Sequence, residues 1–226
     1  ALDRAEAAGV PVVAVDQGPT AGKVAITVRG DSVLEGRQGC EALGEAMGGK
    51  GKVLELQGDL AGAIGVQRSK GFNDCMAEEY PDITVVSRPT QWAQEKATTA
   101  TQTVLSTDPD VNGIFLASDS AMLPGVIEVL SRLGRLVPAG QEGHVPIVSI
   151  DGSPFGLEQV RAGYVDAVMA ARLGDYATLS AEYLERAMNG ETFDLGPTDH
   201  NSTIVQDGEN IADILVATPV TKANVD

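Results

Sequence analysis

Three aspartates each follow directly on a short apolar run that has no polar alternation. The runs and their acids are VPVVAVDQG with Asp16, GIFLASDS with Asp119 and VPIVSIDGSP with Asp151. Uninterrupted Val- and Ile-rich runs are typical of strands that helices cover on both faces, as in a parallel sheet. Ligands bind at the carboxyl ends of such strands, so these carboxylates are candidates for one binding site. The alternative is that each Asp caps a helix or turn that follows it.

Four other side chains with binding chemistry fall after predicted strands or in loops. They are Gln17, Arg68, Trp92 and Ser118. A flat indole can stack on the apolar face of a sugar ring, while carboxylates, amides and a guanidinium match its hydroxyls. Two of them have an ordinary structural alternative. Trp92, the only Trp in the sequence, could anchor a core, and Arg68 could pair with Glu55 or Asp59.

The sequence contains no complete motif for catalysis or for metal binding. The run GEAMGGK at 44–50 resembles a phosphate loop, but Gly51 stands where a Ser or Thr would bind magnesium, and the run ends a helix. No dinucleotide fingerprint and no nucleophile elbow occurs. Asp16 and Asp151 could in principle form an acid/base pair. We therefore expect a protein that is not an enzyme and needs no cofactor or metal.

Composition narrows the class of partner. The 226 residues carry 16 Lys and Arg against 32 Asp and Glu, a net charge of -16, which disfavours nucleic acid and anionic membrane surfaces. No apolar run is long enough to span a membrane. Cys40 and Cys75 make no zinc pattern with His144 and His200. The two cysteines are either bridged, if the protein is extracytoplasmic, or small buried hydrophobes.

Strands and helices alternate along nearly the whole chain, which predicts βαβ units and an α/β fold with parallel sheets. The number of strands suggests two sheets. No flexible linker separates them, so two lobes would be joined by direct crossings. The predicted crossings are at 29–32, at 171–174 and after Gln206, and the tail VATPVTKANVD is predicted to be irregular.

The order of these phrases resembles one family. The chain is similar to periplasmic sugar-binding proteins of the ribose-binding type, the substrate-binding subunits of bacterial ABC importers. The resemblance is carried by AEAAGVPVVAVDQG, RGDSVLEGRQGCEALGE, GKVLELQGDLAGAIGVQRSKGF, PTQWAQEKA, DPDVNGIFLASDSAMLPG and IVSIDGSP. It implies two Rossmann-like lobes joined by a hinge, the periplasmic binding protein type I fold. We expect an N-terminal lobe of 1–30 plus 172–204 and a C-terminal lobe of 31–171 plus 205–226.

The resemblance also implies a role for each candidate residue. Asp16 and Gln17 match an Asp-Arg pair that holds sugar hydroxyls, with Gln in place of Arg. Arg68 matches a ligand-binding arginine, Trp92 an aromatic beside the ring, and Asp151 an acid that accepts hydrogen bonds from hydroxyls. Ser118 stands where the family usually has an Asn, and Asp119 is the helix cap beside it. The family's hinge glutamine falls at Ala171, and the neighbouring Arg172 is the candidate to replace it.

The resemblance places the start of this chain after the family's first strand, helix, strand and helix, so we expect an incomplete first lobe with apolar edges exposed. It implies closure of two lobes on a neutral sugar or polyol, recognition by a membrane permease of an ABC transporter, and a periplasmic or lipoprotein-anchored location. The rivals are the effector-binding core of a LacI-type repressor and a sugar-processing enzyme. The sequence leaves open which sugar is bound, the oligomeric state and the cysteine bridge.

Overall fold

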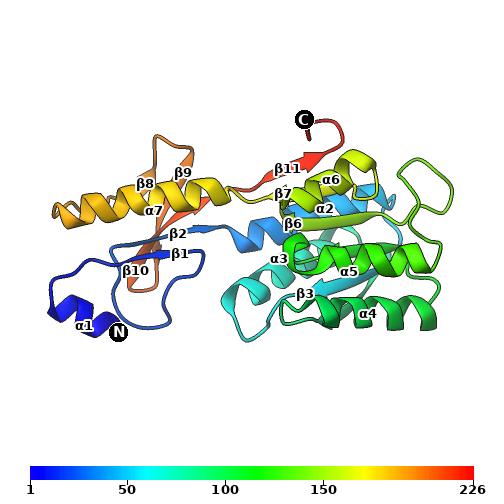
Figure 1. The fold of residues 1–226 in the computed structure, drawn as a ribbon, viewed down its shortest axis with the longest axis horizontal. Coiled ribbons are helices and arrows are strands. Elements are labelled where there is room, and N and C mark those ends of the chain that lie inside the picture. Colours follow the sequence, from blue (N-terminus) through cyan, green and yellow to red (C-terminus); the bar gives the residue numbers. More distant parts are fainter. The chain divides into compact units, whose positions relative to one another are not determined.

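The structure, a computed structural model, describes residues 1–226 and divides the chain into two compact units. The first unit comprises 1–31 and 171–217, and the second comprises 32–170 and 218–226. The chain therefore passes from one unit to the other three times, after Asp31, Ala170 and Ala217. Each unit has its own sheet (Figure 1).

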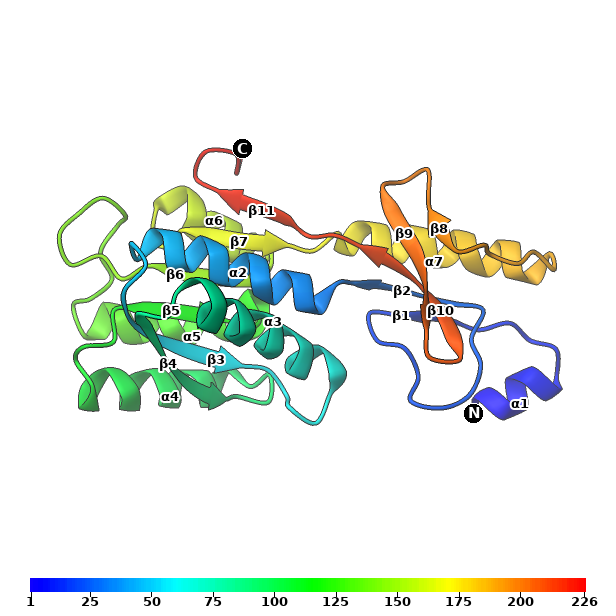
Figure 2. The same ribbon diagram turned by 180° about the vertical axis from the view of Figure 1, so that it is seen from behind.

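The second unit is a six-stranded sheet between two layers of helices. The strand order is β11-β7-β6-β5-β3-β4, and every neighbouring pair is parallel except β11 and β7. The strands are β3 (Gly51–Gln57), β4 (Ile83–Pro89), β5 (Gly113–Leu116), β6 (Ile147–Asp151), β7 (Ala167–Ala170) and β11 (Thr218–Thr221). The helices are α2 (Ser32–Ala46), α3 (Ala63–Glu79), α4 (Gln94–Thr107), α5 (Asp119–Arg132) and α6 (Pro154–Ala162). Helices α2 and α3 cover one face, and α4, α5 and α6 cover the other (Figures 1 and 2).

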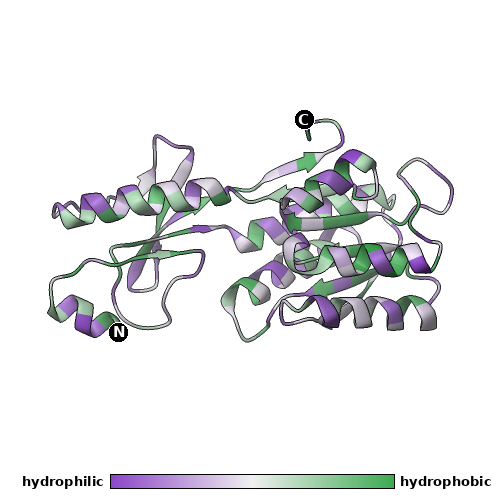
Figure 3. Cartoon of the chain, in the orientation of Figure 1, coloured by the Kyte–Doolittle hydropathy of each residue, from purple (hydrophilic) through white to green (hydrophobic).

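Burial in this sheet follows the apolar runs of the sequence. All four residues of β5 are buried, as are the first four of β6, because helices pack on both faces of these central strands. In Figure 3, helix α5 carries both hydrophobic (green) and hydrophilic (purple) residues, as expected of a helix that buries one face. On the α2/α3 face, Phe72 stacks on Phe115 with ring centroids 4.0 Å apart. The predicted alternation of strand and helix is confirmed here.

Helices α2 and α3 lie unusually close together because glycines line their contact. A Cβ at Gly36 would collide with the backbone carbonyl of Arg68, and one at Gly71 would collide with that of Val33. A disulfide between Cys40 and Cys75 joins the same two helices, so the structure has the bridge that the sequence left open.

The first unit is a smaller, mixed sheet. Its strand order is β1-β2-β10-β9-β8; β1, β2 and β10 are parallel, while β9 runs antiparallel to β10 and β8. The elements are α1 (Leu2–Ala7), β1 (Val13–Val15), β2 (Ile26–Gly30), α7 (Leu173–Met188), β8 (Gly196–Pro197), β9 (Ser202–Asp207) and β10 (Asn210–Leu215). Its core joins Tyr176, Leu179 and Tyr183 of α7 to Ile26 and Val28 of β2. Strand β1 forms one edge of the sheet.

The C-terminal part of the chain differs from the prediction. Residues 205–217, expected in the second lobe, lie in the first unit because β10 pairs with both β9 and β2. The tail is not irregular: β11 pairs antiparallel with β7. The extra strand β10 follows a tight turn at Gly208, whose φ is 63°. None of the helices combines the length and hydrophobicity that crossing a bilayer requires.

Candidate ligand-binding site

The second unit gathers four of the predicted residues at one edge of its sheet. Asp151 is the last residue of β6, Ser118 follows β5 and Trp92 follows β4. Because these strands are parallel members of one sheet, their carboxyl ends share that edge. Arg68 reaches the same edge from α3, donating to the Asp151 carboxylate.

The Asp151 carboxylate is the centre of this cluster. Its Oδ1 accepts a hydrogen bond from Arg68 Nη1 at 2.9 Å. Its Oδ2 accepts from Ser118 Oγ at 2.5 Å and from Ser120 Oγ at 2.9 Å. The Asp151 side chain keeps 16% of its surface exposed, so a ligand hydroxyl can still reach it. A carboxylate has about four lone-pair positions, and three are filled here, which leaves room for one further donor.

Arg68 is held from a second side by a residue that the sequence analysis missed. Its Nε donates to Glu35 Oε2 of α2 at 2.9 Å, and its Nη1 also donates to the Ala117 carbonyl at 2.7 Å. The side chains of Arg68 and Glu35 are 8% and 2% exposed. Burial alone would lower the pKa of Arg68, but the charges of Glu35 and Asp151 outweigh it and raise that pKa, which fixes the guanidinium as a cation.

The sequence carried a signal for Glu35. Helix α2 buries Glu35, Gly39 and Leu43 at helical spacing, so the acid lies on the apolar stripe and not on the solvated face. The alternative partner Glu55 is wrong for Arg68: it accepts hydrogen bonds from Ser69 at 2.7 Å and Ser87 at 2.5 Å instead.

The cap of α5 is Ser118 and not Asp119, which was predicted for that role. Ser118 is the N-cap, since its Oγ accepts from the Ala121 amide at 3.2 Å. Asp119 is fully buried and accepts from the amides of Gly152 and Ser153 at 3.1 Å. Burial, and then the nearby charge of Asp151, raise the pKa of Asp119 to about 6. Asp119 thus fixes the loop that carries Asp151 and is not the helix cap.

Backbone strain marks several candidate positions. Five non-glycine residues have positive φ, and three of them are predicted site residues: Asp16 at 68°, Trp92 at 60° and Asp151 at 105°. Such conformations are costly and persist where the surrounding structure holds them in place, often at binding sites. Trp92 is half-buried, and its indole lies against Gly58, where a Cβ would collide with the ring.

The other three predicted residues belong to the first unit. Asp16 and Gln17 are exposed directly after β1, and the Asp16 amide bonds the Val28 carbonyl at 2.8 Å. The Arg172 guanidinium is bound within its own unit, to the Asp175 carboxylate at 2.6 Å and to the backbone carbonyls of His200 and Asn201. Its predicted contact with a ligand therefore stays a prediction.

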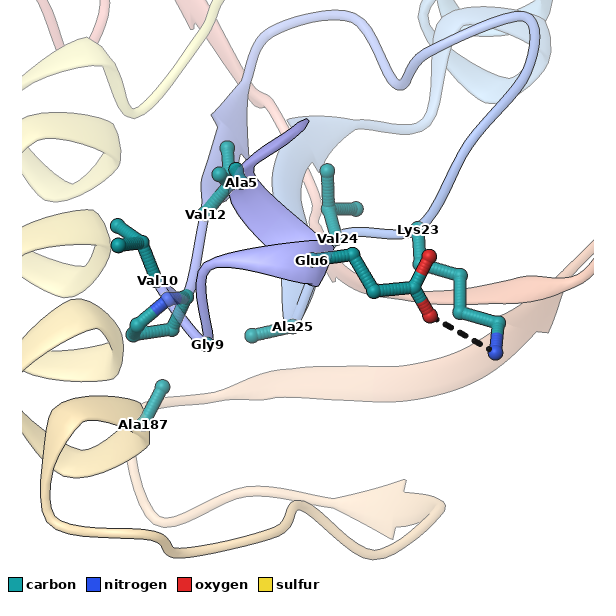
Figure 4. A pocket seen from close by; sticks show the side chains of 10 residues that line it. Ala5, Glu6, Gly9, Val10, Val12, Lys23, Val24, Ala25 and Ala187 are labelled. Carbon is teal, nitrogen blue, oxygen red and sulfur yellow. Dashed lines mark ion pairs between the residues drawn. The ribbon is translucent and has the colours of Figure 1, made fainter. Parts of the chain in front are cut away.

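A separate pocket of about 340 Å³ in the first unit contains none of the predicted residues. Small and apolar side chains line it, with the exposed Glu6–Lys23 ion pair at 3.2 Å (Figure 4). Val10 and Val12 precede β1, whereas Asp16 follows it, so this pocket lies at the opposite end of the strand. No group of three or more His, Cys, Asp or Glu side chains is arranged to hold a metal ion.

Comparison with known proteins gives consistent similarities. A family model described as a periplasmic binding protein domain matches residues 1–192. The xylitol-binding protein of Mycolicibacterium smegmatis is 32% identical over 161 residues, covering 70% of this chain and 44% of that protein. Ribose import binding protein RbsB of Salmonella typhimurium is 27% identical over 191 residues, covering 84% and 62%. The match thus spans only part of these relatives, 44% of the first and 62% of the second.

A solved structure extends the similarity to the fold. An ABC transporter periplasmic solute binding protein from Actinobacillus succinogenes, with bound D-allose, superposes with a TM-score of 0.84 at 26% identity. The superposition covers 99% of this chain and 74% of that one.

Proposed function

Because the chain belongs to the periplasmic binding protein domain family, we propose that it is the substrate-binding component of a bacterial ABC importer for a neutral sugar or polyol. The observation that carries the proposal is the Asp151 cluster, where one partly exposed carboxylate is oriented by Arg68, Ser118 and Ser120. A fixed, charged acceptor bonds a hydroxyl donor more strongly than a neutral one does.

The proposed site uses the residues predicted from the sequence, but two of them have a changed role. Arg68 and Ser118, predicted to bind the ligand, orient Asp151. Asp151 accepts from a hydroxyl, and Trp92 offers an aromatic surface for the ring. Asp16 and Gln17 add contacts from the first unit, with Arg172 at the crossing between units. A ligand held by residues of both units favours the arrangement in which both engage it, which is the signal that a permease reads.

The similar proteins suggest the size of the ligand. Their names include xylitol, ribose and D-apiose, and one solved structure holds D-allose. All are uncharged and carry several hydroxyls, which suits a site of carboxylates and short polar side chains. We therefore propose a neutral ligand of five or six carbons, bound without turnover.

The proposed location is the periplasm or the outer face of a membrane. The Cys40–Cys75 disulfide supports it, because such bridges persist in oxidising compartments. The bridge and the import functions of the relatives also favour a transport protein over the effector-binding core of a LacI-type repressor.

A thermal-shift screen of this chain against ribose, xylitol, apiose and allose tests the proposal. A ligand that binds only the folded state must raise the melting temperature. We expect a rise of several degrees with at least one of them, and recovery of that ligand unchanged after long incubation. A cooperative melt that none of the four shifts would contradict the proposed ligand class.

Substitution of Asp151 tests the site itself. One charge-assisted hydrogen bond is worth about 1.5 to 3 kcal/mol, so Asp151→Ala should lose at least about tenfold in affinity. Asp110→Ala removes an exposed acid of the same unit and serves as the control. Unchanged binding by a folded Asp151→Ala protein would rule out this site.

A further inference from the structure

Arg68 is the cation of the second-unit cluster, and two carboxylates share it. Glu35 Oε2 and Asp151 Oδ1 each lie 2.9 Å from a guanidinium nitrogen. Asp119 adds a third acid close to Asp151, because its carboxylate accepts from the amides of Gly152 and Ser153, which directly follow Asp151. The positive charge that could attract an anionic ligand is therefore already compensated inside the protein.

Glu35 is held firmly enough to act as a fixed charge. Next to it, Gly36 lets α2 approach the Arg68 backbone more closely than any residue with a Cβ would allow. One turn further along α2, Cys40 is bridged to Cys75 of α3. Because Glu35 and Arg68 are both buried, water screens their interaction weakly.

We infer that Glu35 is a specificity-determining residue, which compensates Arg68 so that the site accepts neutral polyhydroxyl ligands and rejects those bearing a carboxylate. This inference rests on the proposed function. It assigns the selection of neutral over acidic ligands to a buried residue that pairs with Arg68. Glu35 acts through Arg68 and is a positioning residue for it.

The physical reason is the charge that a ligand meets. A sugar acid placed against Asp151 would bring two anions together, and the Arg68 guanidinium beside Asp151 is already shared with Glu35. Like charges juxtaposed at a buried interface are strongly unfavourable. Glu35→Gln keeps an oxygen that can accept from Arg68 Nε but removes the charge, so Arg68 gains the capacity to attract a ligand carboxylate.

The test compares neutral compounds with their own acids. Isothermal titration calorimetry measures ribose against ribonate and xylitol against xylonate, on the unchanged chain, on Glu35→Gln and on Glu45→Gln. Glu45 is exposed on the same helix, so its variant loses the same charge away from Arg68. We expect the unchanged chain and Glu45→Gln to prefer the neutral partner by at least about tenfold, and Glu35→Gln to reduce that preference by about tenfold.

The outcomes separate the inference from the proposed function. If the unchanged chain binds neither these two pairs nor apiose or allose, both the inference and the proposed function are overturned. Binding of ribose or xylitol with an equal preference in all three proteins overturns the role of Glu35 and leaves sugar binding standing. Equal losses for the neutral compound and its acid in Glu35→Gln show a purely structural role, which also overturns it.

A second measurement needs no variant. The amides of the two acids, ribonamide and xylonamide, have nearly the shape of ribonate and xylonate but carry no charge. On the unchanged chain, we expect calorimetry to show at least about tenfold tighter binding of each amide than of its acid, because only the acid places a second anion against Asp151. Equal binding of amide and acid shows rejection by shape and overturns the inference, even if Glu35→Gln fails to fold.

Discussion

The two units present their candidate ligand residues in opposite ways. In the second unit, Arg68 and Ser118 are buried and hydrogen-bonded around Asp151. In the first unit, Asp16 and Gln17 are exposed at the end of a three-residue strand. The second unit therefore has its part of the proposed site in place before any ligand arrives, whereas of the first-unit candidates only Arg172 is held by hydrogen bonds of its side chain to neighbouring residues, and Asp16 and Gln17 lie exposed.

The packing of the two units explains this difference. The second unit encloses its sheet between helical layers, and a disulfide joins two of its helices. The first unit packs one long helix, α7, against its sheet to form its core. It leaves two apolar side chains exposed: Val15 in the edge strand β1, and Val10 just before that strand. Buried side chains in a close-packed scaffold have few alternative rotamers, which is what orients a binding group.

Removing the disulfide should weaken the second unit most. Loss of a native disulfide typically costs about 2 to 5 kcal/mol, and both cysteines here are fully buried, so Cys40→Ala/Cys75→Ala adds a packing loss. Denaturant unfolding, with and without a reducing agent, measures the effect. Because no cysteine lies in the first unit, a transition belonging to that unit should not move. An equal shift of every transition would show that the units unfold as one.

Two glycine-to-alanine changes should have opposite signs in the two units. Gly36→Ala places a Cβ against the Arg68 carbonyl and should cost about 1 to 3 kcal/mol by overpacking. Gly174→Ala, in α7, meets nothing within 4 Å and should stabilise by up to about 1 kcal/mol through helix propensity. Thermal and chemical denaturation of both variants measure these changes. Destabilisation of the same size in both would contradict the difference in packing.

Prediction from sequence succeeded where local pattern and burial agree. The run that became β5 is apolar throughout, and the run that became β6 holds only apolar or small residues before its final acid, so these strands and the acid at the end of β6 could be predicted. Strands β10 and β11 were missed because each depends on pairing with a distant strand, β2 or β7, which local pattern does not reveal. Glu35 was missed because acids on helices usually face solvent.

The pH dependence of stability should reveal the buried Asp119. Its pKa in the folded protein is about 6, above the ordinary value of 3.8, so the native state binds more protons than the unfolded state between these pH values. The stability that this group contributes is full below about pH 4 and is lost as pH rises through 6. The wild type should therefore lose about 1 to 3 kcal/mol relative to Asp119→Asn between pH 4 and pH 7.

The difference between these two stability curves isolates Asp119, since every other acid is common to both proteins. Asp110→Asn, which changes an exposed acid of the same unit, should give a curve parallel to the wild type. Parallel curves for Asp119→Asn as well would contradict the raised pKa.

The smallest effect on stability should come from Asp16→Asn, and its comparison with Asp151→Asn separates the two units. Asp16→Asn should alter the free energy of unfolding by less than about 0.5 kcal/mol, because Asp16 is exposed and Asn tolerates its positive φ. Asp151→Asn should destabilise the second unit by about 1 to 3 kcal/mol, because Arg68 loses one of its buried charged partners. If Asp16 contacts the ligand as proposed, both variants still lose affinity in calorimetry. A loss of stability in Asp16→Asn equal to that in Asp151→Asn would show that the first unit holds its acid as firmly as the second, and unchanged affinity would remove Asp16 from the proposed site.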